Sequence, residues 1–240
     1  MVTLDQCGIE SFNKVLKINI LMRVRQITEA WPWQNVLGFN EPQTQPTTAK
    51  IPNQPQPQPR IDFSSIQNNP LAQQLLKAAQ TAGLKGAELA QFMAQCKHES
   101  WDFSRLKELA GQRHYFNRYD PKHNPRTARI LGNKQRGDGE RYKGRGFIQI
   151  TGRNNYEQAS RALNIDLVKN PDLAARPDIA ASIAIWYWTQ RVRPNVKDWT
   201  DTHQVTRYIN SGLKGIEDRI RNFNMFYKAP SATASRSAAK

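Results

Sequence analysis

The chain has 240 residues, of which 38% are hydrophobic, so it can bury a sizeable core. It lacks a run of about 20 apolar residues, and this argues against a membrane span. Its two cysteines, Cys7 and Cys96, lie in regions of very different character, which argues against a structural disulfide and against a four-ligand zinc site. The formal net charge is +15, and residues 61–228 carry 27 Lys and Arg against 16 Asp and Glu. This bias favours a polyanionic partner: nucleic acid, anionic lipid or an acidic cell-wall polymer.

The first 60 residues divide into two segments of different character. Residues 1–39 are too short to fold dependably alone but contain an apolar stretch at 15–27, so we interpret them as a docking segment. Residues 40–60, "NEPQTQPTTAKIPNQPQPQPR", lack apolar periodicity and predict an extended Pro/Gln-rich linker. The start codon is open between Met1 and Met22.

Residues 61–228 carry mainly helical patterns. Apolar residues at three-to-four spacing predict helices over 71–79, 89–98 and 216–227, and a shorter one over 202–211. Residues 178–192 are apolar on nearly every face, which predicts the buried central helix. Only 141–153 reads as β, and residues 229–240 form a basic, disordered tail. The expected fold class is mainly α with a small β-hairpin.

Two glutamates occur nine residues apart in "KHESWDFSRLKE", residues 97–108. On one straight helix, Glu99 and Glu108 would point to opposite sides, about 13 Å apart along the axis. A turn over 101–104 would let them face each other as a catalytic pair. The alternative is that Glu99 is an ordinary residue at a helix C-terminus and Glu108 a solvated charge paired with Arg105. A zinc-protease helix would need a second histidine at position 102, where Asp102 stands, so we expect no metal and no cofactor.

A second polar stretch, "GDGERYKGRGFIQITGRNNY", spans residues 137–156. Its glycines allow close approach of the backbone to a ligand, and its spacing does not match a phosphate-binding loop. Guanidinium, amide and hydroxyl groups beside aromatic rings are typical of a sugar-binding surface. They are supplied at alternating positions by Arg141, Arg145, Gln149, Thr151 and Asn155.

The segments "FMAQCKHES", "GDGERYKGRGFIQITGRNNY", "AIWYW" and "VTRYINSGLKGIEDR" occur in the order seen in family 19 glycoside hydrolases. The chain resembles this chitinase-like family, with its lysozyme-like α-fold, over about residues 65–228. The nine-residue spacing is similar to that of the bacteriophage endolysin branch. The resemblance implies that Glu99 is the general acid, Glu108 the base, and Thr151 with Gln149 a pair that positions water or holds substrate. Tyr142, Arg145, Asn210 and Arg219 would line or brace the cleft as substrate-binding residues.

The sequence departs from the family pattern at two places. Trp101 and Asp102 stand where the family commonly has glycines, which makes Trp101 a candidate for stacking on a sugar face. Glu140 stands where an aromatic residue is expected and is an alternative to Glu108 as the base, or a partner of Arg141. We interpret the neighbouring His98 as orienting Glu99 or a backbone carbonyl.

The expected function is inverting hydrolysis of the β-1,4 glycan backbone of bacterial peptidoglycan. Chitin is the alternative substrate. Residues 1–39 could dock to phage tail or baseplate proteins, so the protein would act at lysis or on entry. It would be made in the host cytoplasm and act at the cell wall, in the periplasm, or be carried in the virion tail. A catalytically dead module that binds cell wall or nucleic acid is a third interpretation.

Overall fold

The computed structural model describes residues 58–111 and 114–229. The expected docking segment 1–39, most of the linker 40–60 and the tail from 230 onward lie outside these residues.

Helices make up most of the described chain, as expected. The α-helices are α2 (Pro70–Thr81), α3 (Gly86–Glu99), α4 (Pro125–Leu131), α5 (Asp138–Arg141), α6 (Arg153–Leu163), α7 (Pro177–Tyr187), α8 (Thr202–Arg207) and α9 (Ile216–Phe226). Short 3-10 segments lie at Ser64–Ile66 (η1), Tyr115–Tyr119 (η2), Pro171–Ala175 (η3) and Arg193–Asn195 (η5), and a π-helical turn, η4 (Trp188–Val192), extends α7.

The core forms where the apolar faces of α2, α3, α7 and α9 meet. α3 packs against α9, and α2 packs against α7. α2 begins as its sequence predicts, because Pro70 occupies its first turn and the Asn69 side chain accepts a hydrogen bond from the Ala72 N–H. Trp186 of α7 and Trp188 of η4 are both buried, so this aromatic cluster belongs to the core.

The two paired strands lie outside residues 141–153, where the sequence predicted a β-hairpin. β1 (Arg60–Ile61) pairs with β2 (Tyr227–Lys228) in an antiparallel sheet that joins the two ends of the domain. Within the expected hairpin, 141–153, only an isolated bridge forms, between Arg145 and Ile150. Positive φ angles at Gly146, Gln149 and Gly152 interrupt the extended backbone that a longer ladder requires.

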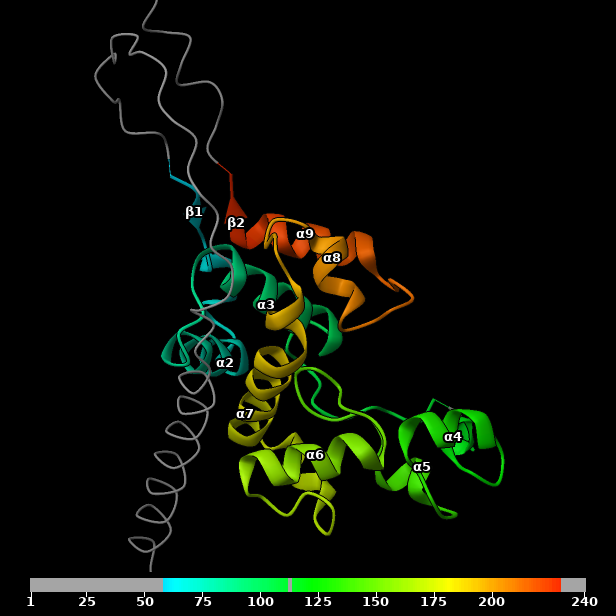
Figure 1. The fold of residues 1–240 in the computed structure, drawn as a ribbon. Coiled ribbons are helices and arrows are strands. Elements are labelled where there is room, and N and C mark those ends of the chain that lie inside the picture. The colour runs from blue at the N-terminus through cyan, green and yellow to red at the C-terminus, as the bar shows by residue number, and fades with distance from the viewer. Residues whose placement is uncertain (1–57, 112–113, 230–240) are drawn as a thin grey trace, which may run out of the picture.

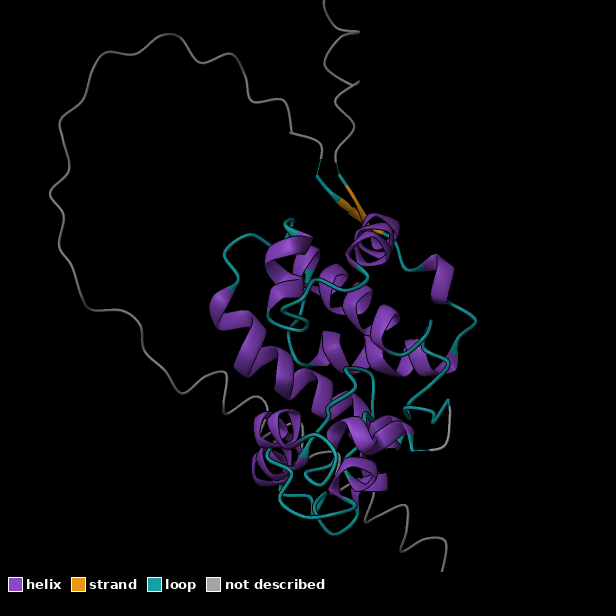
Figure 2. Ribbon diagram, turned by 90° about the vertical axis from the view of Figure 1, so that its right-hand side faces the viewer, coloured by secondary structure: helices purple, strands orange, loops and turns teal. Residues whose placement is uncertain are grey.

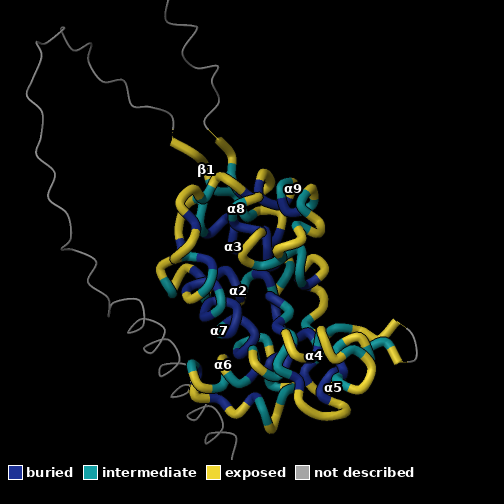
Figure 3. The backbone as a smooth tube through the Cα atoms, turned by 45° about the vertical axis from the view of Figure 1, so that its right-hand side comes forward, coloured by how far each residue is buried: buried dark blue, intermediate teal, exposed yellow. Residues whose placement is uncertain are grey.

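The elements divide along the long direction of the molecule (Figures 1 and 2). The sheet and α9 lie at one end, and α4, α5 and α6 lie at the other, while buried segments run through the middle (Figure 3). None of the helices in the described part is long and apolar enough to cross a membrane.

Candidate active site

The chain reverses sharply directly after α3. Trp101, Asp102 and Phe103 adopt consecutive left-handed conformations, with φ of 50°, 60° and 58°. Such conformations cost about 1–2 kcal/mol for each non-glycine residue. The fully buried Phe103 ring packs against Phe147, and the Asp102 N–H donates to the Lys97 carbonyl over 2.8 Å, which hold the turn in place. The turn expected after Glu99 is therefore confirmed.

Glu99 is held by an arginine of α9. Arg219 Nη2 donates to Glu99 Oε1 over 2.5 Å, and Arg219 Nη1 donates to Gln95 Oε1 over 2.5 Å. Gln95 in turn donates to Thr206 Oγ1 over 3.0 Å, so its buried amide is satisfied. Arg219 is 1% exposed. The Arg219 guanidinium therefore fixes the Glu99 side chain of α3 against α9.

His98 makes a parallel contact one residue earlier. Its Nδ1 lies 2.6 Å from Asp218 Oδ2, so it orients neither Glu99 nor a backbone carbonyl, contrary to our interpretation. Burial would raise the pKa of Asp218, but hydrogen bonds and charge from His98 and Arg221 outweigh this and lower it. A Cβ at Gly215 would overlap the His98 ring, so this close approach of the two segments requires glycine.

Glu108 is held by hydrogen bonds from other segments of the chain than those that hold Glu99. Gly144 N donates to Glu108 Oε2 over 2.9 Å, and the Tyr119 hydroxyl donates to Glu108 Oε1 over 2.9 Å. The Glu108 N–H also donates to the Gly144 carbonyl over 2.9 Å. Burial and the neighbouring Glu108 carboxylate raise the pKa of Tyr119, so this hydroxyl remains a donor. Both oxygens of Glu108 are thus oriented by hydrogen-bond donors.

Glu99 and Glu108 line one cleft of about 450 Å³. The remaining lining residues combine cationic, aromatic and amide side chains with small ones: Trp101, Arg105, Lys107, Leu109, Ala110, Gly111, Tyr115 and Gln149. The 101–104 turn thus brings the two carboxylates to a common cavity. Glu108 pairs with Tyr119 and Gly144, and not with Arg105 as the alternative interpretation required.

Gln149 and Thr151 differ in their relation to this cleft. Gln149 lines it and donates from Nε2 to the Gly146 carbonyl over 2.8 Å. Thr151 is absent from the lining residues, and its hydroxyl donates to the Gln149 carbonyl over 3.0 Å. Thr151 therefore supports the left-handed backbone of Gln149, and its expected contact with water or substrate stays a prediction.

Three residues expected to bind substrate are buried and can only brace the cleft. Tyr142 is 1% exposed and Arg145 is 4% exposed, and Arg219 is equally enclosed. The Arg145 guanidinium bonds to the Tyr156 hydroxyl, to Asp172 and to two backbone carbonyls, so its donors are used inside the protein. Of the two roles considered, lining and bracing, the geometry fits bracing.

Asn210 and Trp101 lie nearer the surface. The Asn210 side chain accepts a 3.2 Å hydrogen bond from the Gly212 N–H and shapes the loop before α9, without lining the cleft. Trp101 is 68% exposed and lines the cleft, which suits stacking on a sugar. The Arg105 guanidinium lies 4.7 Å from the centroid of the Trp101 ring, so one face is covered.

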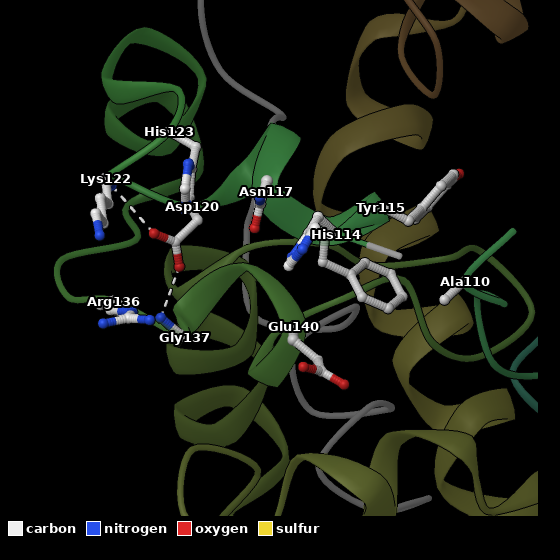
Figure 4. A pocket seen from close by; sticks show the side chains of 11 residues that line it. Ala110, His114, Tyr115, Asn117, Asp120, Lys122, His123, Arg136, Gly137 and Glu140 are labelled. Atoms are coloured by element: carbon white, nitrogen blue, oxygen red, sulfur yellow. Dashed lines mark hydrogen bonds between the residues drawn. The ribbon is translucent and has the colours of Figure 1, made fainter. Parts of the chain in front are cut away.

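Glu140 lies in a different hollow from Glu99 and Glu108. It lines a neighbouring cavity of about 550 Å³, between η2 and α5 (Figure 4). Glu108 is therefore the better placed base. Within 58–111 and 114–229, no group of three His, Cys, Asp or Glu residues could hold a metal ion.

The sequence did not point to Tyr119, Gln95 or the Gly144 N–H. Tyr119 reaches Glu108 from a 3-10 segment whose position no periodicity specifies. Gln95 did offer a signal, because Gln91, Gln95 and Glu99 follow one another at single-turn spacing in a helix whose other buried residues are apolar. A buried amide at that place indicates a polar partner.

Two carboxylates facing one open cleft, each oriented by hydrogen bonds, are the arrangement of a glycoside hydrolase. Residues 72–220 match the family model of Glyco_hydro_19, described as chitinase class I. The chain therefore belongs to glycoside hydrolase family 19.

Individual relatives agree with this assignment. A glycosyl hydrolase family 19 domain-containing protein of Haemophilus influenzae is 34% identical over 155 residues, covering 55% of this chain and 74% of that protein. An endochitinase of Arabidopsis thaliana is 34% identical over 148 residues, covering 59% of this chain and 47% of that protein. The chain thus spans about half the length of this plant relative. The crystal structure of chitinase C from Streptomyces griseus has 24% identity and a TM-score of 0.47, covering 66% of this chain and 67% of that chain.

Proposed function

We propose that this protein cleaves the β-1,4 glycan backbone of bacterial peptidoglycan with inversion of configuration. The observation that carries this proposal is the common cleft of Glu99 and Glu108. Each carboxylate is fixed by a different part of the fold, Glu99 by α9 and Glu108 by Tyr119 and Gly144. In an inverting enzyme, the two carboxyl groups act from opposite faces of the sugar.

The hydrogen bonds suit different roles for the two carboxyl groups. Arg219 occupies Glu99 Oε1, whereas Glu99 Oε2 has no hydrogen-bond partner among the described residues and is available to carry a proton to the leaving oxygen. Glu108 receives donors on both oxygens, which suits a carboxylate that accepts a proton from water. Attack by this water and protonation by Glu99 would pass through an oxocarbenium-like state.

The charge of the domain favours peptidoglycan over chitin. Residues 61–228 have a net charge of +11, and the cleft contains Arg105 and Lys107 beside the two glutamates. Peptidoglycan is anionic because its peptide stems carry carboxylates, whereas chitin is uncharged. Long-range attraction to an anionic wall would raise the rate of encounter, most strongly at low ionic strength.

The test is digestion of purified peptidoglycan by the full chain, with mass analysis of the reducing ends. Products ending in free N-acetylmuramic acid are expected from the wild type. Glu99→Gln should yield none, and Glu217→Gln, which removes an exposed carboxylate of α9, should match the wild type. Intact glycan after wild-type treatment would refute the proposal.

Chitin is the second candidate substrate, because plant relatives of this chain are named endochitinases. Release of N-acetylglucosamine oligomers from chitin, measured beside the peptidoglycan digest at equal enzyme concentration, separates the two. A chitinase would release these oligomers from chitin, and it would leave a suspension of bacteria without outer membranes turbid. A protein that binds walls without cutting them would show no difference between wild type and Glu99→Gln.

We further propose a phage context, either lysis or entry. In the entry version, residues 1–39 dock to tail or baseplate proteins, and the linker tethers the catalytic domain. The composition of residues 40–60 supports this version. Mass spectrometry of purified particles tests it: presence in the virion supports entry, and synthesis confined to late infection with absence from particles supports lysis.

A further inference from the structure

A second hollow adjoins the catalytic cleft. It has a volume of about 550 Å³ and lies between η2 with the following loop on one side and the start of α5 on the other (Figure 4). Ala110 and Tyr115 line both this hollow and the catalytic cleft, so the two cavities are neighbours. We call it the side pocket, lined by Ala110, His114, Tyr115, Phe116, Asn117, Asp120, Lys122, His123, Arg136, Gly137 and Glu140.

The walls of the side pocket are fastened together without a ligand. Asp120 Oδ2 accepts a 2.6 Å hydrogen bond from the Gly137 N–H, and Asn133 Nδ2 donates to the Tyr119 carbonyl over 2.8 Å. A Cβ at Gly139 would lie 2.5 Å from the Phe116 carbonyl oxygen, so α5 rests directly on η2. The pocket is therefore formed in advance of binding.

Exposed side chains of opposite charge line different parts of the side pocket. Lys122 and Arg136 lie at the end remote from Ala110, and Glu140 lies between them and the catalytic cleft (Figure 4). Within the described part of the chain, neither cation forms an ion pair. Asp120 is buried, and its oxygens accept from the N–H groups of Lys122 and Gly137. The side chains of Lys122, Arg136 and Glu140 are thus exposed for a ligand with charges of both signs.

We infer that the side pocket binds the ionised peptide stem that branches from peptidoglycan beside the bond that is cut. This inference rests on the proposed function. The stem carries carboxylates and, on its diamino acid, an ammonium group, which match Lys122 with Arg136 and Glu140. A chitin chain has no such branch. The side pocket would therefore give the enzyme its preference for peptidoglycan, while Glu99 and Glu108 would cut either glycan.

The test compares the variant Lys122→Ala/Arg136→Ala with the wild type on three substrates: intact peptidoglycan, the same glycan strands after an amidase has removed the stems, and a soluble N-acetylglucosamine hexamer. We expect kcat/KM to fall about fivefold to tenfold on intact peptidoglycan, as for two partly exposed charge contacts. It should stay within about twofold on the two substrates without stems.

The control is Lys197→Ala/Arg207→Ala, which removes the same charge from exposed residues that line neither cavity. It should leave the ratio of activities on intact and stripped strands unchanged. Equal losses of kcat/KM in the two double variants would assign the effect to net charge and would overturn the inference. The inference would also be overturned if Lys122→Ala/Arg136→Ala lost activity equally on all three substrates, or lost none.

A direct binding measurement keeps the inference testable if the activities are small. Titration of Glu99→Gln with a free stem peptide should shift NMR signals of residues lining the side pocket, and Lys122→Ala/Arg136→Ala should abolish the shifts. Wild-type enzyme that cuts the hexamer and neither form of peptidoglycan would refute the proposed function itself. Cleavage of both forms at ratios insensitive to Lys122 and Arg136 would refute only the side-pocket inference.

Discussion

Arg219 holds Glu99 across the interface of α9 and α3, with Nη2 donating to Glu99 Oε1 over 2.5 Å while Nη1 donates to Gln95. The planar guanidinium serves two acceptors one helical turn apart, which a lysine cannot do with one ammonium group. The position of Glu99 in the cleft therefore depends on this fork as well as on the positive charge.

Arg219→Lys should lower kcat about tenfold to 100-fold and destabilise the protein by about 1–3 kcal/mol, because it leaves the buried Gln95 oxygen without its donor. Hydrolysis rates and urea unfolding check the two effects. Arg221→Lys changes a side chain that is 69% exposed and serves as the control. If kcat of Arg219→Lys equals that of the wild type, the fork does not position Glu99.

Glu99→Gln should reduce kcat by about 10²–10⁴-fold, the usual contribution of a general acid, with little change in the affinity for glycan. The amide keeps the shape of the side chain and an oxygen for Arg219. Steady-state kinetics and glycan binding by calorimetry separate the effects. A loss confined to KM would remove Glu99 from the chemistry.

Tyr119→Phe removes the hydroxyl that donates to Glu108 Oε1. We expect kcat to fall about tenfold and stability to change by about 1 kcal/mol, the net value of one hydrogen bond. Tyr208→Phe, at a residue 39% exposed, should change neither. Unchanged kcat in Tyr119→Phe would show that the Gly144 N–H alone orients the carboxylate.

The sequence predicted the helices of the core because burial sets their pattern. Leu75, Leu76 and Ala79 recur at helical spacing and are buried in α2, and the apolar segment at 178–192 forms α7 and η4 as expected. Helix geometry predicted the turn after Glu99, since nine residues of straight helix could not bring two glutamates together.

The predicted position of the β structure, residues 141–153, was wrong, because apolar residues among glycines do not reveal the backbone φ angles that the segment adopts. Gln149 adopts a φ of 49°, which its side chain does not reveal, and this closes the 145–150 segment into a tight turn. The short strands β1 and β2 contain two residues each, too few for any alternation to appear. Tyr119 escaped prediction because it reaches Glu108 from a short 3-10 segment, whose position no apolar periodicity specifies.

Gly144→Ala should impair the base selectively. A Cβ at Gly144 would lie 2.7 Å from Gln149 Oε1 and 3.1 Å from Glu108 Oε2, so both cleft side chains must move. We expect kcat to fall at least tenfold, by loss of the optimal geometry for proton transfer, while the melting temperature falls by only a few degrees. At Gly212 a Cβ would make an ordinary 3.5 Å contact, so Gly212→Ala should be neutral. Equal kinetics for the two variants would contradict this.

Asp138→Asn should destabilise the protein in a pH-dependent way. Burial would raise the pKa of Asp138, but hydrogen bonds from Arg153 and from two backbone N–H groups lower it below its ordinary value. Because its folded pKa is depressed, its stabilisation is complete above the unfolded pKa, about 3.9, and is lost as the pH falls through the folded value.

The difference in unfolding free energy between wild type and Asp138→Asn should therefore be about 3–5 kcal/mol at pH 7, as for a broken buried ion pair, and should shrink below about pH 4. Urea unfolding at several pH values measures it, with Glu217→Gln as the exposed control. A difference independent of pH would mean that packing, and not ionisation, accounts for the effect.

Glu99 and Glu108 are anchored to different parts of the molecule, Glu99 to α9 and Glu108 to Tyr119 of η2 and to Gly144. The distance between the two carboxylates is therefore set by how these two parts pack against each other. Small changes in that spacing would alter the room for the attacking water without breaking a single bond to either glutamate.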